Sequence, residues 1–196
     1  MSKRKYTKTL RAEQQDETRN RIVEAMVALH QELGPAKTSV KAIADKAGVQ
    51  RLTVYRHFPD EASMLQACTA HYLELHPPPD LTTWADIEGP LNRSSTALLA
   101  FYKYYGQTQQ MWDAAYRDLG QVEALQPPME QFEAYIDHIV QGLVNDWDLK
   151  ASIKKQIHLT LRHALRFSTW QSFEKLGLTE QKKTALVESW LNSIVN

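Results

Sequence analysis

Residues 39–58 restrict the fold of this chain more than any other part of the sequence. Apolar side chains recur there at helical spacing, Gly48 interrupts the pattern, and a second short helical run follows. Two short helices that cross steeply need small residues where they touch and a glycine in the turn between them. Ala44 and Ala47 supply the small residues, and Gly48 can adopt the left-handed conformation that ends a helix. The segment therefore predicts a helix-turn-helix.

The second helix of this segment leaves one face free. The side chains on that face are those of Gln50, Arg51, Leu52, Thr53, Tyr55, Arg56 and His57. They combine long hydrogen-bond donors with one apolar group, which suits a helix lying in the major groove of DNA. Arg51 can reach two acceptors of a guanine, and Leu52 can press on a thymine methyl group. Ser39, at the start of the preceding helix, can offer its hydroxyl and the backbone N–H groups to a phosphate.

The charge of the chain is split between its two ends, although the formal net charge is zero. Residues 1–60 carry 12 Lys and Arg against 7 Asp and Glu, a net of +5, whereas residues 61–196 carry 11 against 16, a net of −5. Only a segment that contacts DNA has to replace phosphate counterions. The split is therefore typical of a basic DNA-binding part joined to a part that does not touch DNA.

Helical spacing recurs along the whole chain, and no stretch alternates apolar and polar residues as a half-buried strand would. The sequence therefore predicts an all-α fold. The expected helices span about 16–33, 40–47 behind a cap at Thr38 or Ser39, 50–57, 61–76 behind a cap at Asp60, 90–106, 108–119, 128–147, 150–176 and 179–195.

The domain organisation follows from breaks in this pattern. Three consecutive prolines at 77–79 cannot continue a helix, so the domain connection is expected there or just before. The expected parts are a flexible basic arm at 1–16, a helix-turn-helix domain at 17–62 with its motif at about 38–57, and a helical ligand-binding and dimerisation domain at 63–196.

Residues 17–65 resemble the DNA-binding domain of the tetracycline-repressor (TetR/AcrR) family. The matching positions are Thr18, Arg19, Ile22, Gly34, Thr38 to Val40, Ile43, Ala44, Ala47 to Val49 and Thr53 to Phe58. The resemblance covers about a quarter of the chain. It implies an N-terminal three-helix DNA-binding domain followed by a C-terminal helical domain that binds a ligand and dimerises.

The same resemblance assigns roles to the free face of the second helix. It implies that Thr53, Tyr55 and His57 contact phosphates, and that the residues nearest the base edges are Gln50, Arg51, Leu52 and Arg56. Two positions depart from the family pattern. Leu52 stands where the family most often has a small residue, and Glu61 stands where it often has a phosphate-binding lysine.

A carboxylate at position 61 would repel a phosphate, so that contact is either lost or supplied by another basic side chain. The candidates are Lys37, Lys41 and the arm residues Lys3, Arg4, Lys5 and Lys8. The arm itself is either a solubilising tail or a further DNA contact. Both readings stay open at this point.

The aromatic residues of the second domain predict a cavity for a small, mostly apolar ligand, because rings with polar tips can both enclose and orient such a molecule. The favoured lining residues are Phe101, Tyr105, Trp112, Tyr116, His138 and Trp170. The helices expected at 150–176 and 179–195 carry apolar positions for pairing with a second copy, as in the family. These positions are Ile157, Leu161, Leu165, Leu186, Trp190 and Ile194.

The expected function is that of a homodimeric repressor which leaves a palindromic double-stranded DNA operator when it binds a small-molecule effector. Activation in place of repression remains open. The alternative is a helical small-molecule binding protein whose N-terminal domain has lost specific DNA binding, a reading that Glu61 supports.

Other classes of function have little support in the sequence. No phosphate-binding glycine loop or nucleophile elbow is present, so an enzyme is not expected. The pairs His71/His76 and His158/His163 are spaced i, i+5, unlike the i, i+4 pair of a helix-borne zinc site, so neither a metal nor a cofactor is expected. No apolar run approaches the roughly 20 residues of a membrane helix and no signal peptide is seen, so a cytoplasmic location is expected. Cys68 is expected to be a small buried residue without a chemical role.

Overall fold

The computed structural model describes residues 3–196, with side chains from Ala12 onward. The described chain is helical, as predicted, and contains no strand. Its residues group into two units, which we call the head (Met1–His76 with Asp113–Pro128) and the body (Pro77–Trp112 with Met129–Asn196). None of the described helices is long and apolar enough to cross a bilayer.

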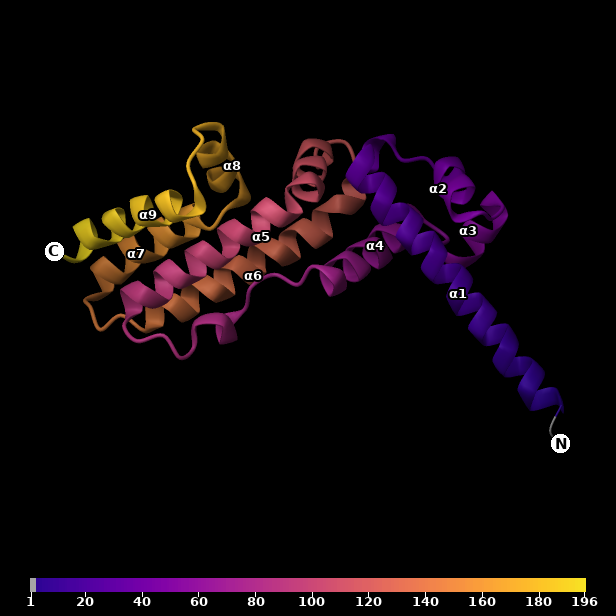
Figure 1. The fold of residues 1–196 in the computed structure, drawn as a ribbon, viewed down its shortest axis with the longest axis horizontal. Coiled ribbons are helices and arrows are strands. Elements are labelled where there is room, and N and C mark those ends of the chain that lie inside the picture. Colours follow the sequence, from indigo (N-terminus) through magenta and orange to yellow (C-terminus); the bar gives the residue numbers. More distant parts are fainter. Residues whose placement is uncertain (1–2) are drawn as a thin grey trace. The chain divides into compact units, whose positions relative to one another are not determined.

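The head contains the helix-turn-helix (Figure 1). Its elements are α1 (Lys3–Glu32), the 3-10 helix η1 (Pro35–Lys37), α2 (Val40–Ala47), α3 (Arg51–His57), α4 (Glu61–Leu75) and the 3-10 helix η3 (Glu123–Leu125). Helix α1 packs against α2 and α4, α2 packs against α3, and α4 packs against η3. The core between them is formed by the buried residues Ile22, Met26, Ile43, Ala44, Val54, Phe58, Met64, Leu65 and Cys68.

The ends of the short helices are fixed by local chemistry. The hydroxyl oxygen of Ser39 accepts the N–H of Ala42 at 3.1 Å, so α2 begins behind Ser39. Gly48 ends α2 in the left-handed conformation, with φ 66° and ψ 39°. Asp60 accepts the N–H of Ser63 at 2.7 Å and completes a capping box at the start of α4. These three predicted signals are confirmed.

Two boundaries in the head differ from expectation. Helix α1 begins at Lys3, so the arm expected before Asp16 is helical from that residue onward. The stretch contains neither glycine nor proline and is rich in good helix formers, which explains the extension. The side chains of residues 1–11, including Lys3, Arg4, Lys5 and Lys8, lie outside the described residues, and their role stays a prediction. Helix α4 groups with the head beyond the expected boundary at residue 62, because it packs on α1.

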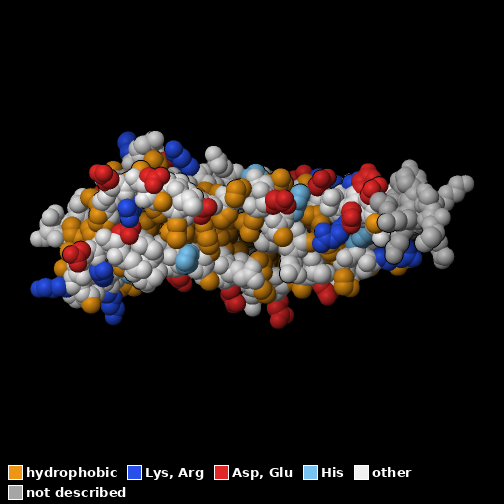
Figure 2. Space-filling view, turned by 90° about the horizontal axis from the view of Figure 1, so that it is seen from below, with side chains coloured by type: hydrophobic (Ala, Val, Ile, Leu, Met, Phe, Trp, Pro, Cys, Tyr) orange, Lys and Arg blue, Asp and Glu red, His pale blue; other side chains and the backbone are white. Residues whose placement is uncertain are grey.

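The body is a bundle of helices (Figure 1). Its elements are the 3-10 helix η2 (Leu81–Trp84), α5 (Pro90–Asp118), α6 (Gln126–Asn145), α7 (Ala151–Ala164), α8 (Phe167–Lys175) and α9 (Glu180–Val195). Helices α5 and α6 each contribute one end to the head. On the face of the body that Figure 2 shows, basic and acidic side chains are interspersed rather than gathered by sign.

The expectation of two helices on either side of Gly106 was wrong, because α5 runs through this residue without a break. One glycine in a helix costs only about 1 kcal/mol relative to alanine. Buried neighbours on α5 outweigh that cost, since Tyr102 and Tyr105 are both fully buried.

The single helix expected at 150–176 was also wrong, because the chain turns at Leu165 and Arg166 between α7 and α8. The hydroxyl of Tyr102 donates to the carbonyl of Ala164 at 3.1 Å, and that of Tyr105 donates to the carbonyl of Leu165 at 2.8 Å. These buried donors satisfy carbonyls that the end of a helix leaves unpaired.

Candidate nucleic-acid interface

Helix α3 presents the predicted face to solvent. Leu52 is 57% exposed and Tyr55 is 49% exposed, although both are large and partly apolar. The other predicted side chains of this face are exposed at Gln50, Arg51 and Arg56 and half-buried at Thr53 and His57. The structure therefore brings all seven predicted residues together on one short element. Ser39 is also exposed, at the cap of α2.

The opposite side of α3 is anchored in the core of the head. Val54 is fully buried and Phe58 is 1% exposed. The guanidinium of Arg19 lies over the ring of Phe58, 4.9 Å from its centroid, which adds a cation–π contact from α1. This anchoring gives α3 a fixed orientation, so its exposed residues act as one surface.

A polar groove of about 510 Å³ lies between α1 and α3. On the α3 side it is lined by the predicted residues Thr53, Arg56 and His57. The α1 side adds Gln14, Gln15 and Thr18, none of which was among the residues predicted for the site. The two glutamines were missed because the helix was expected to begin only at about residue 16, whereas α1 begins at Lys3 and places Gln14 and Thr18 on one helix face.

Four of the basic side chains around this surface make no ion pair with the residues that the structure describes. Within the part of the chain that the structure describes, Arg51, Arg56, Lys37 and Lys41 make no salt bridge, whereas Lys46 pairs with Glu32 at 3.0 Å. Lys37 and Lys41 are exposed, as is Glu61 at the first residue of α4. The prediction that Lys37 or Lys41 replaces a basic residue at position 61 is compatible with this exposure and stays a prediction.

The turn before α2 is held by the C-terminal end of α5. The carboxylate of Asp118, which is 2% exposed, accepts the N–H of Ala36 at 3.0 Å. Arg117 donates to Asp118 at 2.8 Å and to the carbonyl of Leu33 at 3.0 Å. The guanidinium beside it holds the pKa of Asp118 below its usual range. Gly34 has a φ of 90°, and a Cβ atom there would overlap the side chains of Arg117 and Asp118.

Two titratable groups lie buried behind this surface. The Nδ1 atom of His30 on α1 is 3.3 Å from the Sγ atom of Cys68 on α4. Burial lowers the pKa of His30 to about 4 and raises that of the Cys68 thiol to about 12. Both groups are therefore neutral near pH 7. Cys68 is buried, as predicted, and its raised pKa makes it a poor nucleophile.

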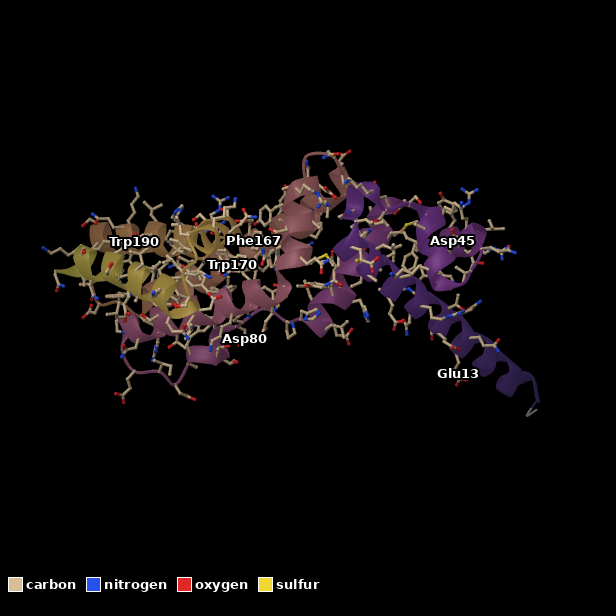
Figure 3. The ribbon with its side chains drawn as sticks, turned by 45° about the horizontal axis from the view of Figure 1, so that its top comes forward. Glu13, Asp45, Asp80, Phe167, Trp170 and Trp190 are labelled. Carbon is tan, nitrogen blue, oxygen red and sulfur yellow. The ribbon has the colours of Figure 1, made fainter. Side chains whose placement is uncertain are left out.

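The body holds an aromatic cluster that contains four of the six predicted ligand residues. The ring of Tyr105 lies 6.1 Å from Phe101, 6.1 Å from Trp112 and 6.0 Å from Trp170. Phe132 and Phe167 complete the cluster without having been chosen, and Phe167 stacks on Trp170 at 5.4 Å (Figure 3). Trp170 is 1% exposed, and its indole N–H finds no acceptor among the described residues.

The other two predicted ligand residues do not join these rings. His138 is exposed on α6, and Tyr116 is half-buried in the part of α5 that belongs to the head. His138 was chosen for a polar tip among the rings, but α6 buries Phe132, Ile136 and Ile139 and turns position 138 toward solvent. Its assignment to the cavity is therefore corrected.

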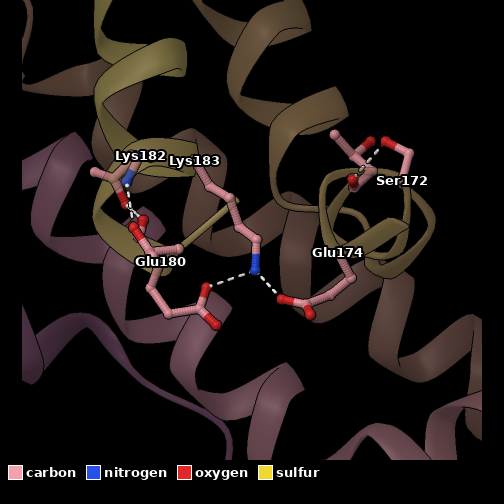
Figure 4. A network of polar contacts seen from close by, with 8 residues as sticks. Ser172, Glu174, Glu180, Lys182 and Lys183 are labelled. Carbon is pink, nitrogen blue, oxygen red and sulfur yellow. Dashed lines mark hydrogen bonds and ion pairs between the residues drawn. The ribbon is translucent and has the colours of Figure 1, made fainter. Parts of the chain in front are cut away.

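An ion cluster around the buried Lys183 joins α8 to α9 (Figure 4). Lys183 is fully buried and pairs with Glu174 and with Glu180, the latter at 2.9 Å. Its ammonium also lies 5.2 Å from the centroid of the Trp170 ring. The cluster therefore fixes the position of α8 on α9.

Three of the apolar positions expected to meet a second copy are used within the chain instead. Ile157, Leu161 and Leu165 are fully buried, because α7 packs on α8 and α9. This part of the prediction was wrong. On α9, Leu186 is 37% exposed, and Trp190 and Ile194 are half-buried.

Comparisons with known proteins agree with this geometry. A family model described as bacterial regulatory proteins, tetR family, matches residues 22–68. The regulator SrpR of Pseudomonas putida is 41% identical over 73 residues, which cover 36% of this chain and 34% of SrpR. The uncharacterised regulator TtgW, also of Pseudomonas putida, is 43% identical over 68 residues, which cover 33% of this chain and 51% of TtgW.

The chain thus matches a third to a half of the length of these relatives, and the family model covers the helix-turn-helix. A TetR-like transcriptional regulator from Rhodococcus sp. RHA1 superposes with a TM-score of 0.62 at 17% identity, covering 88% of this chain and 92% of that one. At this identity the likeness concerns the fold, and it extends over both the head and the body.

Proposed function

We propose that this chain is a transcriptional repressor of the TetR family that binds a palindromic operator as a dimer, since residues 22–68 match the family model. The observation that carries the proposal is the exposed face of α3, where the side chains of Leu52, Tyr55 and Arg51 are all exposed to solvent. Exposing large side chains does not stabilise the free chain. In a major groove, however, such side chains can contact bases and phosphates. The family consists of regulators, so an enzymatic function is not proposed.

The surface extends beyond α3 in this proposal. Thr53, Tyr55 and His57 hold the DNA backbone, and Arg51 and Leu52 read base edges. The groove between α1 and α3 adds Gln14 and Gln15 as further backbone contacts, since amide groups can donate to phosphate oxygens. Two copies related by a two-fold axis would then read half-sites about 34–36 Å apart, or a multiple of that distance.

A second copy is proposed to cover the exposed apolar side chains at the C-terminal end. Leu186, Trp190 and Ile194 follow one another at intervals of four residues, so they form a stripe on α9. Leu159 on α7 is 58% exposed. These residues replace the buried Ile157, Leu161 and Leu165 in the dimer proposal.

The aromatic cluster of the body is the proposed site of the effector. Its rings supply an apolar lining, and the indole N–H of Trp170 supplies a buried donor that lacks an acceptor among the described residues. We expect a small, mostly apolar molecule with one hydrogen-bond acceptor. In the dimer, the form that binds the effector and the form that binds the operator would differ in the distance between the two heads. Each ligand then lowers the affinity for the other by the same factor.

The alternative function, a small-molecule binder without specific DNA binding, rests on Glu61. This residue is exposed at the start of α4, where a phosphate would meet its charge. The two functions are separated by a mobility-shift titration with DNA from directly upstream of the chain's own gene. Specific retardation that Arg51→Ala abolishes supports the repressor, whereas weak retardation that depends only on salt supports the alternative.

A further inference from the structure

A second, smaller pocket lies inside the head itself. It has a volume of about 190 Å³ and is bounded by α1, the turn before α2, and helices α2, α3 and α4. Its deep wall is formed by Ile43, Met64 and Leu65, which are all less than a tenth exposed. Tyr55 and Glu61 stand at its exposed rim. The pocket is distinct from the aromatic cluster, because its lining residues all belong to the head.

The polarity of this pocket is uneven. His30 lines it, but this imidazole is neutral near pH 7 because burial lowers its pKa to about 4. The interior therefore carries no charge. The carboxylate of Glu61 is the only charged group of the lining, and it makes no ion pair with any residue that the structure describes. An apolar floor below one negative group selects a ligand with an apolar body and one positive end.

We propose that the head pocket binds a small aliphatic ammonium ion, with its cation at Glu61 and its carbon chain against Ile43, Met64 and Leu65. The volume corresponds to about six groups the size of a water molecule, so an unbranched amine of about six carbons fits it. The phenol of Tyr55 at the rim adds a hydrogen-bond partner for the ammonium. A carboxylate or phosphate ligand would be repelled by Glu61.

Occupation of the pocket has a consequence for DNA binding, which rests on the proposed function. Tyr55 lines the pocket and also belongs to the exposed face of α3. An ammonium that engages the phenol competes with a phosphate for the same side chain. The amine should therefore lower the affinity for the operator, and the operator should lower the affinity for the amine by the same factor. The body plays no part in this effect.

The binding step is tested first, without DNA, by titrating the full chain with hexylammonium chloride while following the methyl resonance of Met64. Neutral hexanol, which has the same carbon chain, is titrated in parallel. We expect hexylammonium to bind at least tenfold more tightly than hexanol, and Glu61→Gln to remove that difference. Glu74→Gln is the matched control, because Glu74 is exposed on the same helix and lies outside the pocket. If the two ligands bind alike to the wild-type chain, or if Glu61→Gln binds hexylammonium as the wild type does, the proposal is wrong.

Tryptophan emission identifies which unit the amine occupies. All five tryptophans, Trp84, Trp112, Trp147, Trp170 and Trp190, belong to the body. Binding in the head should shift the Met64 resonance and leave the emission nearly unchanged, whereas binding among the aromatic rings should change the emission and leave Met64 unmoved. The second result would overturn the proposal.

The DNA step follows at constant ionic strength, with ammonium chloride as the control salt. Saturating hexylammonium should lower operator affinity several-fold in the wild type and leave it unchanged in Glu61→Gln. If the chain binds no DNA under any condition, the proposed function is wrong. If the Met64 shift and its dependence on Glu61 persist in that case, the proposal that the head pocket binds the amine still holds.

Discussion

The carboxylate of Asp118, the last residue of α5, accepts the backbone N–H of Ala36 at 3.0 Å. Ala36 lies in η1, three residues before Ser39, which caps α2. One hydrogen bond thus joins the end of a helix that begins in the body to the turn that places the helix-turn-helix. Within the head, this contact fixes the turn before α2 to the C-terminal end of α5.

Asp118→Ala should destabilise the head, because it leaves the Ala36 N–H without its acceptor and removes the carboxylate that Arg117 pairs with. The expected loss is about 1–3 kcal/mol of unfolding free energy, measured by urea denaturation. Asp118→Asn should cost less, since its amide oxygen can still accept from Ala36. Asp86→Asn, at an exposed position, is the control. Equal stability of all three variants would contradict the role given to this contact.

Lys183→Met should destabilise the body, because it leaves Glu174 and Glu180 close together without the buried cation between them (Figure 4). The expected loss is about 1–3 kcal/mol, below that of a fully buried pair, since both carboxylates keep some exposure to water. Lys182→Met is the matched control, because Lys182 is exposed on the same helix. Neutralising both carboxylates in the Lys183→Met background should restore stability. A Lys183→Met chain as stable as its control would show that the cluster contributes nothing.

The buried imidazole of His30 predicts a loss of stability in acid. The pKa of His30 is about 4 in the folded chain, whereas an ordinary histidine, as in the unfolded chain, has a pKa of 6.5. As the pH falls, the unfolded state therefore binds the proton first. The stability contributed by neutral His30 is complete above about pH 6.5 and is lost progressively toward pH 4, by about 3 kcal/mol in total.

Urea denaturation at pH 7.0, 5.5 and 4.5 measures this effect. His30→Gln should be less stable at pH 7 but should lose less stability on acidification than the wild type. Asn20→Gln, at an exposed position of the same helix α1, removes no titratable group and should retain the wild-type slope. Identical slopes for His30→Gln and the wild type would contradict the assignment. Asp118, whose pKa is lowered, acts in the same direction at lower pH.

The parts of the fold that were predictable from the sequence are those decided by local chemistry. The caps at Ser39 and Asp60 and the glycine at position 48 act within a few residues of chain, and the structure has each of them where it was expected. The DNA-contact face of α3 was predictable for the same reason. Its exposed positions follow from helical spacing once Val54 and Phe58 are placed in the core.

The parts that were not predictable depend on contacts between distant residues. No glycine or proline marks the turn at Leu165 and Arg166. The backbone carbonyls at this turn accept hydrogen bonds from the hydroxyls of Tyr102 and Tyr105, some sixty residues away in the sequence. The burial of Ile157 likewise depends on which helices surround α7, and apolar spacing alone cannot distinguish a core position from a dimer contact. The grouping of Phe132 with Trp112, whose rings lie 4.3 Å apart, is another contact of this kind.

The central claim, that the exposed face of α3 reads DNA, is tested most directly by fluorescence anisotropy at fixed salt. The full chain is titrated into a duplex from upstream of its own gene and into a shuffled duplex of the same composition, with wild-type protein, Arg51→Ala and the distant control Lys175→Ala. We predict that the wild type and Lys175→Ala prefer the native duplex strongly, and that Arg51→Ala loses about 1–3 kcal/mol of that preference. Equal affinity of the wild type for both duplexes, or an unchanged preference in Arg51→Ala, would contradict the account.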